Sequence, residues 1–113
     1  MVKYSSEVLD RTFSALSDPT RRAILERLGR GPATISELAH PVGMTLPGLM
    51  KHVRILEQAE LVTTEKHGRT RRCRLGPERL GDAAQWIQTH QRRWEGRLDR
   101  LGSYLHERKG GAT

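Results

Sequence analysis

Residues 34–57 read TISELAHPVGMTLPGLMKHVRILE, and the helix-start and helix-stop signals in this stretch decide the fold. Thr34 and Glu37 have the spacing of a capping box, in which each side chain satisfies the other's free backbone amide, so a helix is expected to begin here. Pro41 is expected to end that helix soon after Ala39, because proline has no backbone N–H and clashes with the preceding turn. The first helix of the stretch should therefore be short.

A second helix is predicted directly after it. Gly43 supplies a turn, Thr45 is suited to cap free amides, and Pro47 falls in the first helical turn, where its missing N–H costs nothing. One face of this second helix is apolar: Leu49, Val53 and Leu56. Two short helices joined by a glycine-containing turn, over about 34–59, predict a helix-turn-helix.

The residues that follow, about 61–75, predict a β-hairpin beside the helix-turn-helix. Leu61–Lys66 and Arg71–Leu75 are β-rich or alternating runs, separated by His67–Thr70. The tip and the second strand carry four arginines: Arg69, Arg71, Arg72 and Arg74. A hairpin in this position is a wing, and its charge favours contact with a DNA backbone or minor groove, although arginines also keep an exposed hairpin soluble.

Helices are predicted on both sides of this central part. The first should begin at Ser5 or Ser6 and carries an apolar stripe: Leu9, Phe13 and Leu16. The second should begin at Asp18-Pro19 and stop at Gly29. The last helix, about 78–107, has a nearly heptad stripe: Ala84, Ile87, Trp94, Leu98, Leu101 and Leu105. The expected fold is mainly α with a small β-hairpin, in a single domain over 1–113.

The composition points to nucleic acid and to a partner chain. Twenty Lys and Arg against thirteen Asp and Glu give a net charge of +7, and sixteen of the twenty are Arg, whose fork pairs with phosphate or guanine. Hydrophobic residues are only 35% of the chain, so a partner chain is expected to complete the core. No apolar run suits a signal peptide or a membrane span, so a cytoplasmic protein without a membrane partner is expected.

Three segments together resemble the ArsR/SmtB winged helix-turn-helix repressors: ALSDPTRRAIL at 15–25, ISELA at 35–39 and LPGLMKHVRILE at 46–57. The last helix, with WEGRLDRL at 94–101, looks like the branch of that family without the usual metal ligands. The resemblance implies a homodimer joined through the first and last helices, with the fourth helix of each subunit in a major groove. It also implies repression of a promoter, often the protein's own.

These considerations name two sets of candidate residues. Double-stranded DNA is expected to contact the fourth helix and the wing through Thr45, Pro47, Gly48, Lys51, His52, Arg54, Arg69, Arg71 and Arg72. His52 has a second interpretation, in which it packs between helices. The dimer interface is expected to contain Leu9, Phe13, Ile87, Trp94, Leu98, Leu101 and Leu105. Trp86 and Trp94 have an alternative role, in which they line a pocket for an unidentified apolar effector.

The chain departs from the family pattern at two positions near the fourth helix. Met50 stands where a small polar residue is usual, and its thioether has no proton to donate to a base or phosphate. Glu60 stands where glycine commonly closes the helix, and it would be strained if its backbone is left-handed.

No metal, cofactor or catalytic site is expected. Thr34–Ala39 has no cysteine, and Asp82, His90 and His106 on the last helix are too far apart in sequence to form ligand pairs. The single cysteine, Cys73, excludes an intramolecular disulfide and is either a structural thiol or a redox switch.

The sequence therefore predicts a homodimeric, sequence-specific repressor that acts at an inverted-repeat operator, with half-sites one helical turn apart. The alternative is a winged-helix module that binds another protein and has only non-specific affinity for DNA. An enzyme is not expected, because no nucleophile–base pair or phosphate loop is present in the sequence.

Overall fold

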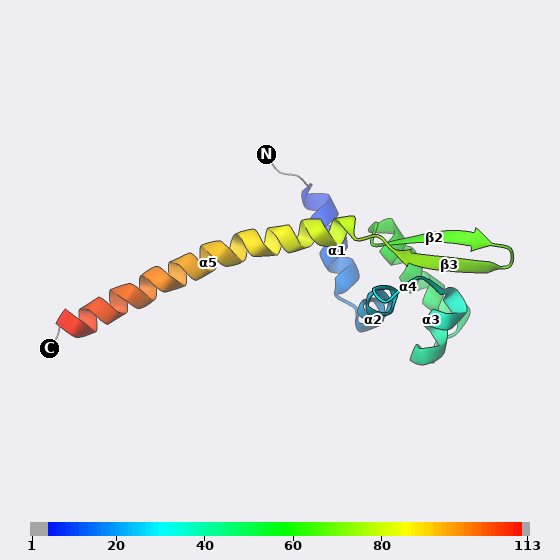
Figure 1. Cartoon of the computed structure of the whole chain (residues 1–113), viewed down its shortest axis with the longest axis horizontal. Coiled ribbons are helices and arrows are strands. Elements are labelled where there is room, and N and C mark those ends of the chain that lie inside the picture. Colours follow the sequence, from blue (N-terminus) through cyan, green and yellow to red (C-terminus); the bar gives the residue numbers. More distant parts are fainter. Residues whose placement is uncertain (1–4, 112–113) are drawn as a thin grey trace. The chain divides into compact units, whose positions relative to one another are not determined.

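The computed structural model describes residues 5–111, with side chains through residue 106, and has a mainly α-helical fold with one small sheet (Figure 1). The sheet is antiparallel, with the strand order β1-β3-β2. The expected fold class, a winged helix-turn-helix, is confirmed. The chain divides into two compact units at Ala83–Ala84. The first unit holds the helix-turn-helix and the wing, and the second holds the rest of the last helix.

The first two helices start where their capping residues predict. Helix α1 (Ser6–Leu16) is capped by the Ser5 hydroxyl, which accepts from the Val8 amide at 3.2 Å. Helix α2 (Pro19–Leu28) is capped by the Asp18 carboxylate, which accepts from the Arg21 amide at 3.0 Å. Both starts are therefore local events, decided within one turn of chain.

Helix α3 (Ile35–Val42) has the predicted capping box but not the predicted end. The Thr34 hydroxyl accepts from the Glu37 amide at 3.2 Å, and the Glu37 carboxylate accepts in return from the Thr34 amide. The prediction that Pro41 ends the helix soon after Ala39 is wrong, because the helix continues through Pro41 to Val42. A proline so close to the end of a helix removes only one helical hydrogen bond. The helix is terminated instead by Gly43, the residue after Val42, whose backbone is left-handed (φ 64°).

Helix α4 (Leu46–Gln58) begins at the predicted cap, with the Thr45 hydroxyl accepting from the Gly48 amide at 3.2 Å. Its apolar face is fully buried: Leu49, Val53 and Leu56. The helix ends at Gln58 with Ala59 as its C-cap. The next residue, Glu60, has a positive φ of 61° and is the one non-glycine residue with a positive φ among the described residues. The sequence left the backbone conformation at Glu60 open, and the structure shows that it is left-handed. The Glu60 carboxylate accepts from Arg79 Nε at 2.6 Å.

The sheet contains one strand more than the predicted hairpin. Strands β2 (Val62–His67) and β3 (Thr70–Leu75) form the wing, and β1 (Ala33–Thr34) adds to the other edge of β3. A two-residue strand carries too little sequence pattern to be recognised. The predicted four-residue loop is wrong, because His67 pairs with Thr70 and only Gly68 and Arg69 remain in the turn. Gly68 has a φ of 61°, which allows this tight connection.

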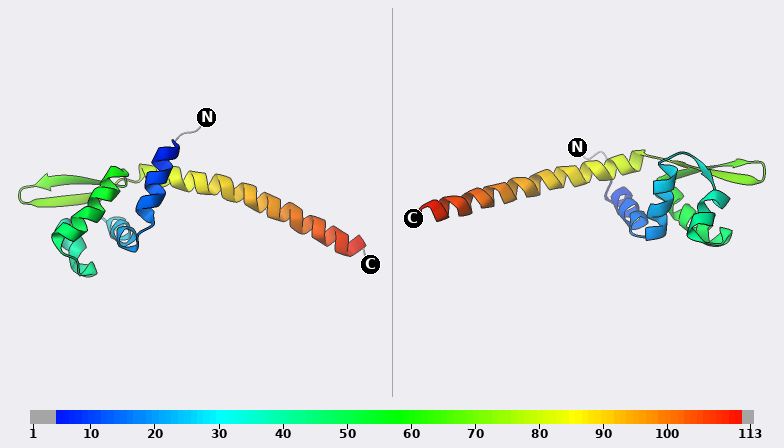
Figure 2. Two further views of the ribbon diagram at one scale, coloured as in Figure 1. Left: turned by 180° about the vertical axis from the view of Figure 1, so that it is seen from behind. Right: turned by 60° about the horizontal axis from the view of Figure 1, so that its bottom comes forward.

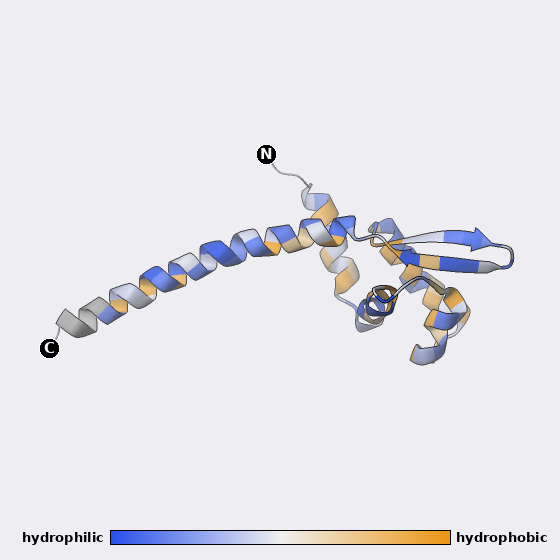
Figure 3. Ribbon diagram, viewed as in Figure 1, coloured by the Kyte–Doolittle hydropathy of each residue, from blue (hydrophilic) through white to orange (hydrophobic). Residues whose placement is uncertain are grey.

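The hydrophobic core of the first unit lies between the helices and one face of the sheet. Its largest fully buried aliphatic side chains come from α2, α4 and β2 or the residue before it: Ile24, Leu49, Val53, Leu56, Leu61 and Val62. Figure 3 shows that the hairpin beyond this core is mostly hydrophilic. The wing is therefore anchored at its base and free of core packing at its tip.

Helix α5 (Glu78–Gly111) continues four residues past the predicted end at about 107. No proline or glycine interrupts the sequence between 103 and 109, so nothing in that stretch favours an earlier stop. Within the described residues, no helix combines the length and the apolar character needed to cross a membrane.

The backbone of Glu60 generates the first prediction. Replacing Glu60 by Ala or by Gly removes the same ion pair with Arg79, but only Gly relieves the left-handed strain. Glu60→Gly should therefore be more stable than Glu60→Ala by about 1 kcal/mol. Chemical denaturation of the two variants measures this difference, and equal stabilities would show that the strain at residue 60 is negligible.

Candidate nucleic-acid interface

The exposed face of α4 carries three of the nine residues predicted to contact DNA. Pro47, Lys51 and Arg54 are exposed and lie at i, i+4 and i+7, which places them in one stripe opposite the buried stripe of the same helix. Lys51 and Arg54 have no hydrogen bond or ion pair with any other residue that the structure describes. Their positive charges are therefore uncompensated by the fold.

At Gly48 no side chain covers the first turn of α4. A Cβ atom at this position would lie 3.1 Å from the Thr45 hydroxyl, which is tighter than ordinary van der Waals contact. Glycine leaves the capping bond unstrained and places no side chain over the first turn. The first turn of α4 thus presents its backbone closely to any partner.

The wing arginines divide between two faces of the hairpin. In the register of β2 and β3, Arg71 is paired with Lys66, and both lie on the face that continues from the buried Cys73. Arg72 lies on the opposite face, directly across from Glu65, while Arg69 occupies the turn. Figures 1 and 2 show the hairpin projecting past α3 and α4. The three predicted wing contacts therefore differ in position and in their neighbouring charges.

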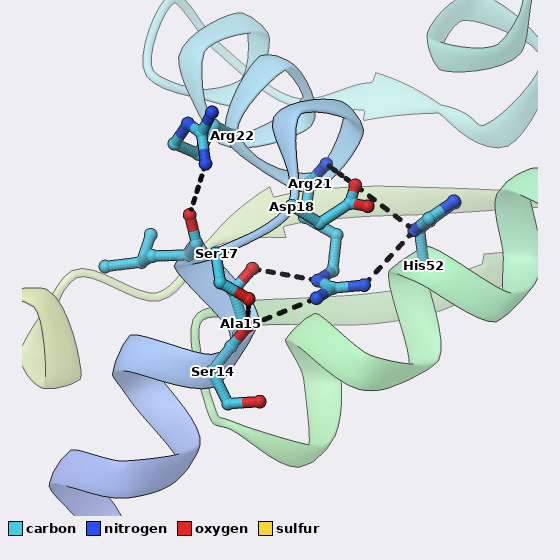
Figure 4. Close-up of polar contacts among 8 residues, drawn as sticks. Ser14, Ala15, Ser17, Asp18, Arg21, Arg22 and His52 are labelled. Atoms are coloured by element: carbon cyan, nitrogen blue, oxygen red, sulfur yellow. Dashed lines mark hydrogen bonds and ion pairs between the residues drawn. The ribbon is translucent and has the colours of Figure 1, made fainter.

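His52 lies on the side of α4 that faces α2 (Figure 4). Its Nδ1 atom is 3.4 Å from Arg21 Nη1 and 3.7 Å from the Asp18 carboxylate. Arg21 can only donate, so this contact requires an unprotonated Nδ1, and 3.7 Å is beyond hydrogen-bond reach of Asp18. This placement matches the second interpretation, in which His52 packs between helices, and its contact with DNA stays a prediction.

Arg21 is a structural residue of this region that the sequence alone did not single out. Its guanidinium donates to the Ala15 carbonyl at 2.8 Å and to the Ser14 carbonyl at 3.1 Å, in addition to its contact with His52. The side chain therefore caps the C-terminus of α1 and holds α4 against it. The backbone amide of Arg21 also lowers the pKa of the Asp18 carboxyl, opposed by desolvation and helped by the charge of Arg21.

Comparisons with known proteins agree with this geometry. A family model described as a helix-turn-helix domain matches residues 16–65. The chain is 33% identical over 79 residues to the transcriptional repressor SdpR of Bacillus subtilis, covering 70% of this chain and 88% of that protein. It is 41% identical over 71 residues to the HTH-type transcriptional regulator Rv2034 of Mycobacterium tuberculosis, covering 63% of this chain and 66% of that protein.

A solved structure decides the family. The crystal structure of an ArsR family transcriptional regulator superposes with a TM-score of 0.78 and 47% identity, covering 84% of this chain and 97% of that one. The chain belongs to the ArsR family of transcriptional regulators. The resemblance predicted from residues 15–57 is thereby confirmed, as is the expectation of a regulator rather than an enzyme.

Two of the three candidate metal ligands of this ArsR family protein, Asp82 and His90, have other partners. Asp82 accepts from Arg79 Nη1 at 3.1 Å, and His90 Nδ1 lies 2.9 Å from the Trp86 carbonyl, to which it donates. The rings of Trp86 and His90 stack at 4.2 Å. Among the side chains that the structure describes, those of residues 5–106, His, Cys, Asp and Glu form no cluster of three that could hold a metal ion.

The predicted dimer residues of the regulator fall into two groups. Leu9 and Phe13 on α1 are half-buried within the first unit. Those on α5 are between 45% and 66% exposed: Ile87, Trp94, Leu98, Leu101 and Leu105. The α5 residues thus form a long apolar stripe that the single chain does not cover.

The Cys73 thiol is buried against the core of the regulator and has no exposed surface. Burial raises its pKa to about 11, the nearby Glu57 carboxylate adds to this, and Arg71 opposes it. The reactive species of cysteine is the thiolate, which such a pKa suppresses. These properties match the structural role rather than the redox switch.

Cys73 should accordingly be unreactive in the folded regulator. At pH 8 only about one thiol in a thousand would be ionised, so Ellman's reagent should label the native protein far more slowly than the protein in guanidinium. Between about pH 9 and pH 11 the unfolded chain loses this proton and the folded chain keeps it, so stability should fall as the pH rises. Equal labelling rates in the native and denatured protein would contradict the assignment.

Proposed function

We propose that this ArsR family protein is a homodimeric, sequence-specific repressor that binds an inverted-repeat operator, its own promoter being the first candidate. The observation that carries the proposal is the exposed stripe of α4, where Lys51 and Arg54 have no partner in the described part of the chain. The similarity to a protein named a transcriptional repressor supports repression.

In the proposed complex, α4 enters the major groove, which is about 12 Å wide and admits a helix. Lys51 and Arg54 then reach guanine edges or phosphates, while Thr45, Pro47 and Gly48 bring the first turn of the helix close to the DNA. The free amides of that turn attract a phosphate. In this arrangement His52 does not contact a DNA base and instead positions α4 through its contact with Arg21.

The wing supplies affinity rather than sequence discrimination. Arg69 in the turn and Arg71 and Arg72 on β3 are exposed and would neutralise phosphates or enter the minor groove. Each phosphate neutralised releases counterions, so this contribution weakens as salt rises.

Dimerisation follows from the apolar stripe of α5. Leu98 is 66% exposed and Trp94 54% exposed, and the spacing of the stripe is that of a heptad repeat. Covering these side chains with the same stripe of a second copy would remove apolar surface from water. Two-fold symmetry would then set the half-sites about 10–10.5 bp apart.

The DNA-binding proposal predicts different defects for α4 and the wing. The purified full chain should prefer the DNA upstream of its own gene over scrambled DNA, and this preference should survive near-physiological salt. Lys51→Ala should reduce the preference, because it removes a contact near the bases. Arg69→Ala should weaken binding to both DNAs alike and lower the salt slope by about 1. Fluorescence anisotropy at several salt concentrations measures both effects.

Arg30→Ala is the matched control, because Arg30 is an exposed arginine that lies on neither α4 nor the hairpin. It should leave both the preference and the slope close to wild type. Equal binding of the wild type to both DNAs, lost at modest salt, would favour the protein-interaction module instead.

The dimer proposal predicts a mass of twice the 12.8 kDa of one chain by sedimentation. Leu98→Glu should give monomers and lose operator binding, because it places a charge in the apolar stripe. Thr89→Glu adds the same charge to an exposed position of α5 outside the stripe and should remain dimeric. A monomeric wild type would contradict this part of the proposal.

A further inference from the structure

Arg71 differs from the other wing arginines in being held by the fold. Its Nη1 atom donates to the Thr64 hydroxyl at 2.7 Å. Arg69, Arg72 and Arg74 have no hydrogen bond or ion pair with any residue in the described part of the chain. One arginine of the wing is therefore fixed in direction while its neighbours are not.

Thr64 in turn is held by α4, the proposed recognition helix that would enter the major groove. Its hydroxyl donates to Glu57 Oε2 at 2.7 Å, and Glu57 belongs to the last turn of α4. The direction of both bonds is unambiguous, because a carboxylate only accepts and a guanidinium only donates. A hydroxyl, which has one proton to give and lone pairs to receive, is the group that can join them. Hydrogen bonds to charged groups are shorter than those between neutral groups, and both of these measure 2.7 Å.

The three residues make a relay from α4 through β2 to β3. Glu57 follows the buried Leu56, which anchors its end of α4 in the core. Thr64 and Arg71 lie on the same face of the hairpin, because Thr64 pairs with Cys73 two residues along β3. The relay thus connects the rigid core to a side chain near the tip of the wing.

The relay leaves Arg71 able to bind a ligand. Of its five guanidinium N–H donors, those on Nε and Nη2 form no hydrogen bond with a described residue. Restricting a long side chain before binding reduces the entropy lost when it meets its partner. Because the relay is exposed to solvent, its contribution to folding stability should be small.

We infer that Thr64 is a positioning residue for DNA binding: it transmits the fixed position of α4 through Glu57 to Arg71 and orients that guanidinium toward a phosphate. This inference rests on the proposed function, in that the ligand of Arg71 is DNA. The inference extends the proposed function by assigning a role to Thr64 and Glu57, neither of which carries a positive charge. The recognition helix and the wing are then coupled parts of one binding surface.

A double-mutant cycle on the full chain tests the inference. Thr64→Val keeps the branched shape and removes the hydroxyl, and it should weaken DNA binding about threefold or more. In the Arg71→Ala background the same substitution should have no further effect, because the group that it positions is absent. Thr64→Ser restores the hydroxyl and should restore the affinity. Lys51→Ala, which is outside the relay, should add to Thr64→Val without coupling.

Scrambled DNA and operator DNA are both used as probes, since a phosphate contact operates on either. If the wild type shows no preference for operator DNA but Thr64 and Arg71 are still coupled, the proposed function is overturned and the inference is supported. The inference would be overturned if Thr64→Val weakened DNA binding equally in the wild-type and Arg71→Ala backgrounds. It would also be overturned if Thr64→Val bound DNA with wild-type affinity while Arg71→Ala bound more weakly. Glu57→Ala cuts the relay at its other end and gives the same cycle if Thr64→Val is poorly folded. Thermal unfolding of every variant separates lost affinity from lost structure.

Discussion

The burial of one stripe of α4 is the constraint on which the rest of the structure depends. Leu49, Val53 and Leu56 have no exposed surface, so the helix cannot rotate about its axis without taking apolar groups out of the core. Because a helix repeats every 3.6 residues, this fixes which residues face away from the core. Lys51 and Arg54 are presented outward for that reason, and His52 is turned toward α2.

The packing of α4 is reinforced at its middle and just past its C-terminal end by arginines from other helices. Arg21 on α2 reaches the end of α1 and His52, while Arg79 on α5 holds the carboxylate of Glu60, where the backbone leaves α4 in a left-handed conformation. Both arginines donate to acceptors at the ends of helices, namely the Ser14 and Ala15 carbonyls in the last turn of α1 and the carboxylate of Glu60 just past α4. In a chain with a net charge of +7, arginines therefore serve two distinct purposes. Some hold the scaffold together, and others remain free on its surface.

The geometry of the sheet determines which arginines of the wing are held by the fold and which remain free on its surface. A strand alternates its side chains between two faces, so consecutive arginines in β3 cannot share one environment. Arg71 lies on the face that leads back to Cys73 and contacts Thr64, whereas Arg72 lies across from Glu65 on the other face. The short strand β1 pairs with β3 opposite Cys73 and Arg72 and closes the base of the sheet. The tip of the hairpin is left without core contacts, as expected for an element that meets a partner.

The sequence by itself determined the features whose causes lie within one or two turns of chain. The caps at Ser5, Asp18, Thr34 and Thr45 bond to amides three residues away, so their spacing alone predicts where four helices begin. The hairpin was predictable in the same way. The membership of the ArsR family was expected instead from the resemblance of residues 15–25, 35–39 and 46–57 to that family. Tertiary structure decided the rest. Arg21 and His52 are 31 residues apart and meet only because α2 packs on α4. Thr64 is seven residues from both Glu57 and Arg71, yet the relay exists only because the first strand of the wing packs on the last turn of α4. Such contacts depend on the relative placement of packed elements, which no local pattern encodes.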